Sequence, residues 1–357
     1  MSKIVVGMSG GVDSAACAYL LKLAGHEVIG VTLRTWISAD GKESRCCEID
    51  DARRVAWQIG MSYHVVNCIA EFKEKITDPF IEDYLQGITP NPCVLCNQFV
   101  KWEKLLEVAN LMGADGIATG HYATIRKLPS GRYTVQKALH AAKDQTYMLY
   151  RLSQEQLART MMPLGKLRKE EVRAIAASAN LSVATKSDSQ EICFVTDGDY
   201  ADYIENYATG PIPDAGDFVD EEGRILGKHR GIIHYTVGQR KGLGLALGYP
   251  AYVKDIRSAT NQVVIAPREK VYHREIICHR LNFMGIDTPW MGEEIPCFVK
   301  VRYHHEGTKA RVTYVAEDVV KITFAEPVWA ASPGQSAVFY DEAGCVLGGG
   351  IIRDVIS

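Results

Sequence analysis

The sequence SGGVDS at residues 9–14 is the feature that most constrains how this chain folds. It stands between a short apolar run, KIVVGM at 3–8, and a run with helical spacing, AACAYLLKLAG at 15–25. A glycine-rich turn between a strand and a helix can bind phosphate, because backbone N–H groups and the helix dipole face the anion. The turn lacks the lysine of the Walker motif, so it is a different kind of phosphate loop.

The residues after this loop alternate between strand and helix patterns. Strand-like runs occur at 26–36, 62–68 and 115–123, and helical runs occur at 50–60 and 101–114. Such alternation predicts an α/β domain with a Rossmann-like parallel sheet that is covered by helices on both faces. Further helical runs continue to about residue 207, at 153–161, 168–180 and 199–208.

The sequence pattern changes from helical runs to short strand-like runs at a Pro/Gly-rich linker that begins at residue 208. Short strand-like runs follow at 217–227, 231–242 and 251–266, with another break expected around 272–277. Alternating strands after this break predict a small C-terminal β-barrel. We therefore predict a catalytic domain at 1–207, a small central β domain at 208–272 and a β-barrel at 273–357.

The net charge and the N-terminal residues indicate which partners and which compartment to expect. The net charge is −3, so a nucleic-acid partner would have to meet a local basic patch. Residues 224–254 carry six Lys or Arg and no acid, although such a run is more often a solvated surface. No apolar run approaches a membrane span, and the start is unlike a signal peptide, so we expect a cytoplasmic protein.

Ten cysteines are present, and two of them form a CxxC motif at Cys93 and Cys96. In a reducing compartment, most of the ten are expected to be thiols. The motif itself is open to three interpretations: a zinc site, a redox pair or a site that handles sulfur. Cys46 and Cys47 are adjacent and are interpreted as structural or incidental, and the cysteines at 17, 68, 278, 297 and 345 are expected in the core.

SGGVDS after a first strand resembles the PP-loop of the ATP pyrophosphatases, which split ATP between its α- and β-phosphates. The resemblance implies ATP with Mg, because Asp13 suits a phosphate site if a magnesium ion lies between the two. Leu33 would pack along adenine, although a core leucine is an equally good interpretation. Gly120 follows a strand at the sheet edge where ligands bind. The implied ATP-binding residues are Gly7, Met8, Ser9, Gly10, Gly11, Val12, Asp13, Ser14, Leu33 and Gly120.

Seven motifs resemble, in order, those of the tRNA-specific 2-thiouridylases (MnmA/TrmU), from residue 3 to about 352. They are GMSGGVDSA, TPNPCVLCN, ATGHYA, KDQTYML, DSQEICFV, HYTVGQRKGLG, and SPGQSAVFYD with GGGII after it. The resemblance implies ATP-dependent 2-thiolation of the wobble uridine of tRNA, with Lys, Glu and Gln acceptors expected. ATP would adenylate the uridine 2-oxygen and release pyrophosphate, and a sulfur nucleophile would then displace AMP from the ring carbon.

Within this family, the resemblance maps the nucleophile to Cys96 and the persulfide carrier to Cys193, where a buried core thiol is the alternative. Many relatives have aspartate at the position of Cys93. The three thiols of Cys93, Cys96 and Cys193 would suit a [4Fe–4S] cluster with an open iron, or a zinc ion with a fourth ligand. The competing hypothesis is a persulfide relay between Cys193 and Cys96, with Cys93 a bystander.

The tRNA contacts are likewise implied by the resemblance. Asn91, Pro92 and Cys93 would border the target base. Further tRNA contacts would come from His121, Lys143, Asp144, Gln145, Arg302, Tyr303 and Gln335. The expected partners are tRNA and an upstream sulfur donor, a cysteine desulfurase or a relay protein, with a monomer as the default. The rival readings are another PP-loop acceptor chemistry and a non-catalytic tRNA- or nucleotide-binding module.

Overall fold

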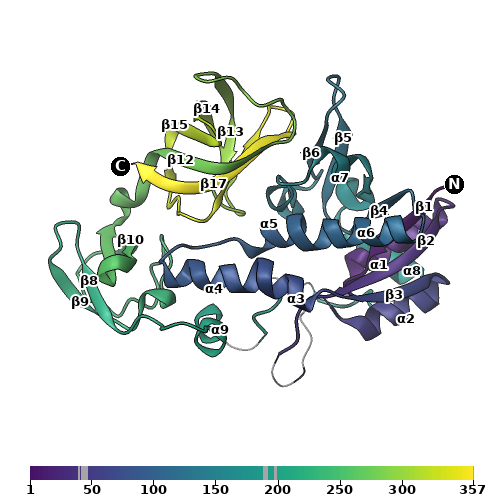
Figure 1. The fold of residues 1–357 in the computed structure, drawn as a ribbon, viewed down its shortest axis with the longest axis horizontal. Helices are drawn as coiled ribbons and strands as arrows, with labels where there is room; N and C mark the ends of the chain where they lie inside the picture. The colour runs from purple at the N-terminus through teal and green to yellow at the C-terminus, as the bar shows by residue number, and fades with distance from the viewer. Residues whose placement is uncertain (39–40, 42–46, 188–191, 197–198, 357) are drawn as a thin grey trace.

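The computed structural model describes residues 1–38, 41, 47–187, 192–196 and 199–356. Its N-terminal part contains a five-stranded parallel sheet with the strand order β3-β2-β1-β4-β7 (Figure 1). The strands are β1 (Lys3–Gly7), β2 (Glu27–Arg34), β3 (Ser62–Asn67), β4 (Gly116–Ala118) and β7 (Thr160–Met161). Strands β2 and β4 flank β1 on opposite sides, so the carboxyl ends of β1 and β4 form the switch point at which such sheets bind ligands.

Helices cover both faces of this sheet, as predicted from the alternating pattern. On one face, Ile4 and Val6 of β1 share an apolar cluster with α1 (Val12–Leu23) and α2 (Ile49–Ile59). On the other face, Val5 packs in a second cluster with Leu105 of α6 (Glu103–Leu111). Successive side chains of a strand point to opposite faces, so β1 contributes to both layers.

A set of helices between β3 and β4 was not predicted. It comprises α3 (Ile69–Phe72), the π-helix η1 (Lys73–Thr77), α4 (Asp78–Leu85), α5 (Pro92–Cys96) and the π-helix η2 (Asn97–Trp102), which continues into α6. In Figure 1, α4 and the α5–α6 helix cross the middle of the molecule, α4 below the barrel and α5–α6 below the β5–β6 hairpin. The CxxC motif therefore lies on a helix.

The rest of the N-terminal part holds short elements. They are β5 (Ala123–Lys127) and β6 (Tyr133–Lys137), which form a hairpin, the 3-10 turns η3 (Ala141–Lys143), η4 (Thr146–Met148) and η5 (Pro163–Lys166), and the helices α7 (Gln154–Ala158), α8 (Lys169–Ser178) and α9 (Tyr200–Tyr207). The run at 153–161, predicted to be helical throughout, ends in strand β7, because Thr160 and Met161 pair with β4. The hairpin was not predicted.

The central part is a four-stranded sheet with the order β10-β11-β8-β9. Its strands are β8 (Gly216–Val219), β9 (Ile225–His229), β10 (Ala251–Arg257) and β11 (Gln262–Pro267). The expectation of a strand at 231–242 was wrong. This segment is the 3-10 turn η6 (Ile232–His234) and a loop, in which Gly238 and Gly242 take positive φ angles of 86° and 77°.

The C-terminal part is a closed six-stranded barrel with the order β12-β15-β14-β13-β16-β17, which confirms the predicted fold class. The 3-10 turns η7 (Ser258–Thr260) and η8 (Arg268–Val271) precede it, and its strands are β12 (Tyr272–Phe283), β13 (Glu294–Lys300), β14 (Thr308–Ala316), β15 (Val319–Trp329), β16 (Ser336–Tyr340) and β17 (Val346–Ile356). The break expected around 272–277 is absent, because β12 runs through it and pairs with β15 and β17. The domain limits at 207 and 272 stay predictions.

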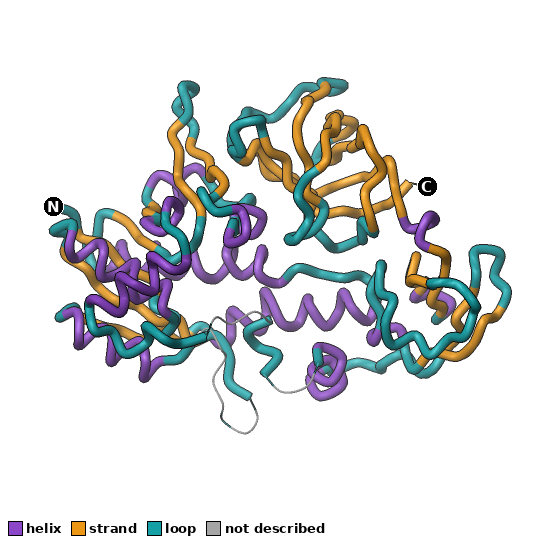
Figure 2. The backbone as a smooth tube through the Cα atoms, turned by 180° about the vertical axis from the view of Figure 1, so that it is seen from behind, coloured by secondary structure: helices purple, strands orange, loops and turns teal. Residues whose placement is uncertain are grey.

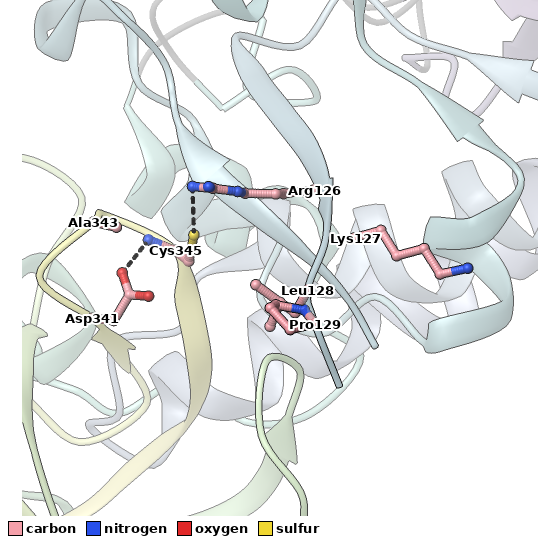
Figure 3. Close-up of a pocket in the computed structure, with 7 residues that line it drawn as sticks. All are labelled: Arg126, Lys127, Leu128, Pro129, Asp341, Ala343 and Cys345. Carbon is pink, nitrogen blue, oxygen red and sulfur yellow. Dashed lines mark hydrogen bonds between the residues drawn. The ribbon is translucent and has the colours of Figure 1, made fainter. Parts of the chain in front are cut away.

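The barrel docks on the β5–β6 hairpin, whose strand β6 lies along the turn before β17. Thr134 donates to the carbonyl of Val346 at 2.6 Å, and the Gln136 amide donates to that of Ala343 at 2.9 Å. Beside them, Arg126 donates to the sulfur of Cys345 at 4.0 Å, and both residues line an open cavity of about 530 Å³ (Figure 3). Seen from behind in Figure 2, the barrel and the hairpin stand side by side above the same helices. No helix among the described residues is long and apolar enough to cross a membrane.

Candidate active site

The SGGVDS loop joins the end of β1 to the start of α1. Gly10 has a φ of +80°, and a Cβ there would lie 2.5 Å from the carbonyl oxygen of Glu48, so the position requires glycine. The Ser14 hydroxyl donates to the carbonyl of Gly11 at 3.0 Å and accepts the N–H of Ser9 at 3.2 Å. These bonds hold the loop in a tight turn at the N-terminal end of a twelve-residue helix.

A cavity of about 210 Å³ opens beside this loop, at the switch point of the sheet. Its lining residues are Gly7, Met8, Ser9, Asp13, Ser14, Val31, Leu33, Thr35, Lys101, Leu105, Thr119, Gly120, His121 and Gln145. Seven of the ten predicted ATP-binding residues are among them, and Gly10, Gly11 and Val12 are not. His121 and Gln145, which were predicted to contact tRNA, lie in this cavity. The sequence analysis singled out none of Val31, Thr35, Lys101, Leu105 and Thr119, although Thr119 lies in the ATGHYA motif.

The carboxylate of Asp13 is held by two residues that sequence reasoning missed. Lys169, the first residue of α8, approaches its two oxygens at 2.7 and 2.8 Å, and the Tyr122 hydroxyl donates to one of them at 2.8 Å. Lys169 and Asp13 are 156 positions apart, so no local pattern could pair them. The ion pair joins the start of α8 to the glycine-rich loop.

A second lysine reaches the loop from the segment before Cys193. The ammonium group of Lys186 donates to the carbonyl of Gly10 at 3.2 Å and pairs with the carboxylates of Glu48 and Asp51. The side chain of Lys186 is one quarter exposed. Since Lys186 bonds the loop backbone, it fixes this segment against the glycine-rich loop.

His121 lies against the cysteine-bearing helix. Its ring stacks at a tilt on Trp102, with centroids 5.4 Å apart, and its Nδ1 lies 3.0 Å from the Thr119 hydroxyl. Burial, with a smaller effect from the positive charge of Lys101, lowers the pKa of His121 to about 3. The imidazole is therefore neutral at physiological pH, which makes it a packing and hydrogen-bonding group.

The CxxC motif forms the first turn of a helix that runs without a break from Pro92 to Leu111. Pro92 is at the first helical position, where its missing N–H costs no hydrogen bond. Cys93 and Cys96 are three residues apart, so they share one face of the helix. Cys93 is partly exposed and Cys96 is 5% exposed. Lys101, five residues after Cys96 on the same continuous helix, lines the cavity beside the glycine-rich loop.

Cys193 lies in a turn that closes with a bond from the N–H of Val195 to the carbonyl of Ile192, at 3.1 Å. Phe194 anchors this turn by packing on Phe80, with ring centroids 5.2 Å apart. Cys193 is partly exposed and packs against the apolar cluster that contains Cys96, so it is not the fully buried thiol of the alternative interpretation. Residues 188–191 and 197–198 beside it, and Cys46, lie outside the described residues.

The other cysteines match their predicted role. Cys17, Cys68, Cys278, Cys297 and Cys345 are all buried. Burial raises the pKa of Cys68 to about 11 and that of Cys297 to about 12, so both are thiols at neutral pH. Cys47 is also buried and donates to the carbonyl of Leu33 at 2.9 Å.

Within the described ranges, no group of three or more His, Cys, Asp or Glu side chains is arranged to hold a metal ion. The iron–sulfur cluster hypothesis for Cys93, Cys96 and Cys193 stays a prediction.

The residues predicted to contact tRNA differ in their surroundings. Tyr303 is half-buried and packs against the apolar cluster that contains Cys96, and burial raises its pKa. Asn91, predicted to border the target base, is partly exposed just before α5, and Lys143 is also partly exposed. The Asp144 carboxylate is buried and accepts bonds from Ala138 N–H and the Thr146 hydroxyl.

Two further predicted tRNA residues use their polar groups inside the protein. Arg302 donates to the carbonyl of Ala330 at 3.0 Å and to that of Val237 at 2.7 Å. The Gln335 amide donates to the carbonyls of Thr89 and Pro90 at 2.9 and 3.2 Å. These side chains join the barrel to the central part and to the cysteine helix.

The acid-free stretch at 224–254 does not stand alone as a positive surface. Lys228 pairs with Asp217 and Lys254 with Glu221, and Arg224 pairs with Asp220. These acids come from β8 and the turn that follows it, before the stretch begins. Folding therefore offsets part of the charge that the linear sequence displays.

Comparisons with known proteins cover nearly the whole chain. Three family models match: a tRNA methyl transferase HUP domain at residues 2–197, a tRNA methyl transferase PRC-barrel domain at 201–267 and an aminomethyltransferase beta-barrel domain at 273–352. The tRNA-specific 2-thiouridylase MnmA of Lachnoclostridium phytofermentans is 51% identical over an alignment of 359 positions, which spans 99% of each chain. That of Clostridioides difficile is 47% identical, over 98% of each chain.

Among solved structures, the U34-tRNA thiolase NcsA from Methanococcus maripaludis with its [4Fe-4S] cluster is similar to this chain at a TM-score of 0.36 and 21% identity. The match covers 57% of this chain and 63% of that one. A likeness of this size carries no argument about a cluster in this protein.

Proposed function

The chain belongs to the tRNA-specific 2-thiouridylase family, and we propose that it thiolates the wobble uridine of tRNA by a persulfide relay between Cys193 and Cys96. Membership makes it a PP-loop enzyme that uses ATP to place sulfur on a tRNA uridine. The observation that carries the proposal is the single helix that bears Cys96 in its first turn and lines the ATP cavity with Lys101 and Leu105.

Adenylation is the step that the ATP loop supports. The uridine 2-oxygen attacks the α-phosphate, the bond between the α- and β-phosphates breaks, and pyrophosphate leaves. On nucleotide binding, Lys169 and Lys186 would exchange their carboxylate partners for phosphate oxygens and so offset the charge of the leaving pyrophosphate. A magnesium ion bound to the nucleotide would meet the carboxylate of Asp13, which lines the cavity.

We assign sulfur transfer to Cys193 and Cys96. The terminal sulfur of a Cys193 persulfide attacks the ring carbon, and AMP leaves with the oxygen. The Cys96 thiolate then attacks the Cys193 sulfur, which breaks the S–S bond and leaves the uridine with a thiocarbonyl. Cys96 and Cys193 end as a disulfide, so a thiol reductant must supply two electrons for the next turnover.

The substrate contacts stay proposals. We assign the target base to Asn91, Pro92 and Cys93, and outer tRNA contacts to Lys143 and Tyr303, whose side chains are partly exposed. The polar groups of Asp144, Arg302 and Gln335 already bond within the protein, which favours a supporting role for them. We further propose that the substrates are tRNAs of the Lys, Glu and Gln classes. The sulfur would come from an upstream cysteine desulfurase or relay protein.

The test compares Cys96→Ala and Cys193→Ala with Cys68→Ala, which removes a thiol from the core. With tRNA, ATP and a persulfide donor, we expect both site variants to bind tRNA and release pyrophosphate but to form no 2-thiouridine. Cys68→Ala should keep thiolating. If Cys193→Ala thiolates tRNA at the wild-type rate, the proposed persulfide relay between Cys193 and Cys96 is wrong.

The cluster hypothesis has its own test. Iron and acid-labile sulfide are measured on anaerobically purified wild type and on Cys93→Ala. About four of each per chain, lost in the variant, would replace the relay by a cluster mechanism. We expect neither, with thiolation retained in Cys93→Ala.

A further inference from the structure

The segment that leads into the cysteine helix has few backbone hydrogen-bond donors. Residues 88–91 read ITPN, and Pro92 follows. Pro90 and Pro92 have no N–H group, so this segment has few donors for bonds of its own. The N–H of Thr89 donates instead to the carbonyl of Pro333, at 3.1 Å, in a turn of the barrel.

The same barrel turn satisfies the carbonyls of this segment. The Gln335 side-chain amide donates to the carbonyl oxygens of both Thr89 and Pro90, at 2.9 and 3.2 Å. Thr89 is 8% exposed and Pro90 is buried, so water cannot readily replace these bonds. Three hydrogen bonds thus join two segments that lie about 245 positions apart in the chain.

The contact between the two segments is also sterically tight. Gly334 has a φ of +88°, and a Cβ there would lie 2.4 Å from Cγ2 of Ile88 and 2.8 Å from the carbonyl oxygen of Thr89. Only a glycine lets the two backbones approach this closely. The barrel turn therefore fits the segment by shape as well as by hydrogen bonds.

The barrel turn reaches the other end of the CxxC turn through the 3-10 turn η4. The Asn97 side chain, directly after Cys96, donates to the carbonyl of Met148 at 3.0 Å. The neighbouring Tyr147 donates its hydroxyl to the carbonyl of Ser336 at 2.8 Å. Residues before Cys93 and after Cys96 are thus both tied to residues 332–336.

We propose that the barrel turn Ser332–Ser336 positions Cys93 and Cys96 for sulfur transfer, with Gln335 as its positioning residue. The inference rests on the proposed function only in taking Cys96 as a sulfur-transfer group. A sulfur atom must meet the adenylated carbon at close range, and a misplacement of about 1 Å can cost about 10²-fold in rate. The family resemblance suggests that Gln335 contacts tRNA, whereas its amide nitrogen is engaged with Thr89 and Pro90.

The first measurement needs neither tRNA nor ATP. Gln335→Ala and Gln335→Glu are compared with Gln86→Ala, an exposed glutamine three residues before Thr89 for which the described residues offer no side-chain hydrogen bond. Iodoacetamide labelling of Cys96 is followed by peptide mass spectrometry, with buried Cys17 as internal reference. We expect Cys96 to react about tenfold faster in both Gln335 variants, because two lost hydrogen bonds loosen the helix start. Gln86→Ala should match wild type.

The second measurement separates positioning from tRNA recognition. In single turnovers, both Gln335 variants should form 2-thiouridine about tenfold more slowly, while tRNA-dependent pyrophosphate release and the Kd for tRNA stay within about twofold of wild type. A residue that only supports the fold would lower all three together. Weaker tRNA binding, with Cys96 labelling unchanged, would overturn the proposal and make Gln335 a tRNA contact.

A second variant keeps the proposal testable if the Gln335 variants are insoluble. Tyr147→Phe keeps the ring and removes only the hydroxyl bond to Ser336, and we expect it to raise Cys96 labelling about threefold. No change in labelling would overturn the proposal. Wild type that fails to thiolate tRNA would instead overturn the proposed function, while the labelling result stands separately.

Discussion

Asp13 and Lys169 form the residue-scale contact that most affects the ATP chemistry. The ammonium group lies within 2.8 Å of both carboxylate oxygens, and the Lys169 side chain is only 11% exposed. A hydrogen-bonded charge pair of this kind contributes about 1.5–3 kcal/mol. We expect Lys169→Gln to slow tRNA-dependent pyrophosphate release by about 10- to 100-fold, with tRNA binding unchanged. The matched control is Lys166→Gln, an exposed lysine of η5, and equal rates in the two variants would contradict the role.

A pH dependence follows from His121, again at the scale of one residue. Its pKa is about 3 in the folded protein, against 6.5 for an ordinary histidine. Between these values the unfolded chain binds a proton that the folded protein does not, so stability falls as the pH falls below about 6.5. From pH 7.5 to pH 5, this term amounts to at most about 2 kcal/mol. Between these two pH values, urea titration should show a larger loss of the free energy of unfolding for wild type than for His121→Gln. Equal losses would contradict the assignment to His121.

At the scale of elements, the close approach of β4 to α1 shapes the ATP cavity. A Cβ on Gly120 would lie 2.7 Å from the backbone carbon of Asp13 and 2.8 Å from the backbone nitrogen of Ser14. We expect Gly120→Ala to push the first turn of α1 away and to weaken ATP binding at least about tenfold, since overpacking costs about 1–3 kcal/mol. Calorimetric titration with ATP measures this. Gly210→Ala is the control, because a Cβ there meets nothing within 4 Å, and similar affinities in both would contradict the packing argument.

The elements also show where the sequence pattern was sufficient and where it was not. The loop before α1 was predicted because glycines, a buried strand and a helical run are adjacent in sequence. The helical character of the CxxC segment was missed because Pro90 and Pro92 read as a turn, and because the helix turn starts on Pro92 under tertiary support from the barrel. The strand expected at 231–242 failed because its β-branched residues are followed by glycines that turn the chain.

At the scale of the whole molecule, Arg302 joins the barrel to the central part. Its guanidinium is largely buried and donates to the carbonyls of Val237 and Ala330. We expect Arg302→Met to lower the free energy of unfolding by about 2–4 kcal/mol, because two carbonyls lose a charged donor. Urea titration measures this. If Arg302 instead contacts a tRNA phosphate, Arg302→Met should leave the free energy of unfolding unchanged. The slope of log K for tRNA binding against log salt concentration should then become smaller by about one.

The arrangement of the three parts was predictable from the order of motifs, but their contacts were not. Lys169, Lys186 and Gln335 each act on a segment more than 130 positions away, and no periodicity links such positions. The charge run at 224–254 misled for the same reason, because Asp217 and Glu221 lie before it in sequence and beside it in space.

The long separation between Pro90 and Gln335 has a consequence for protein synthesis. At about 5–20 residues per second, the cysteine helix leaves the ribosome roughly 10 to 50 seconds before the turn that supports it. A ribosome-bound chain that stops before Ser332 should therefore show Cys96 labelling at least as fast as Gln335→Ala, because it also lacks the bonds to Pro333 and Ser336. Every residue of the ATP loop and both transfer cysteines are made early, but the alignment of the sulfur chemistry waits for the last strands of the barrel.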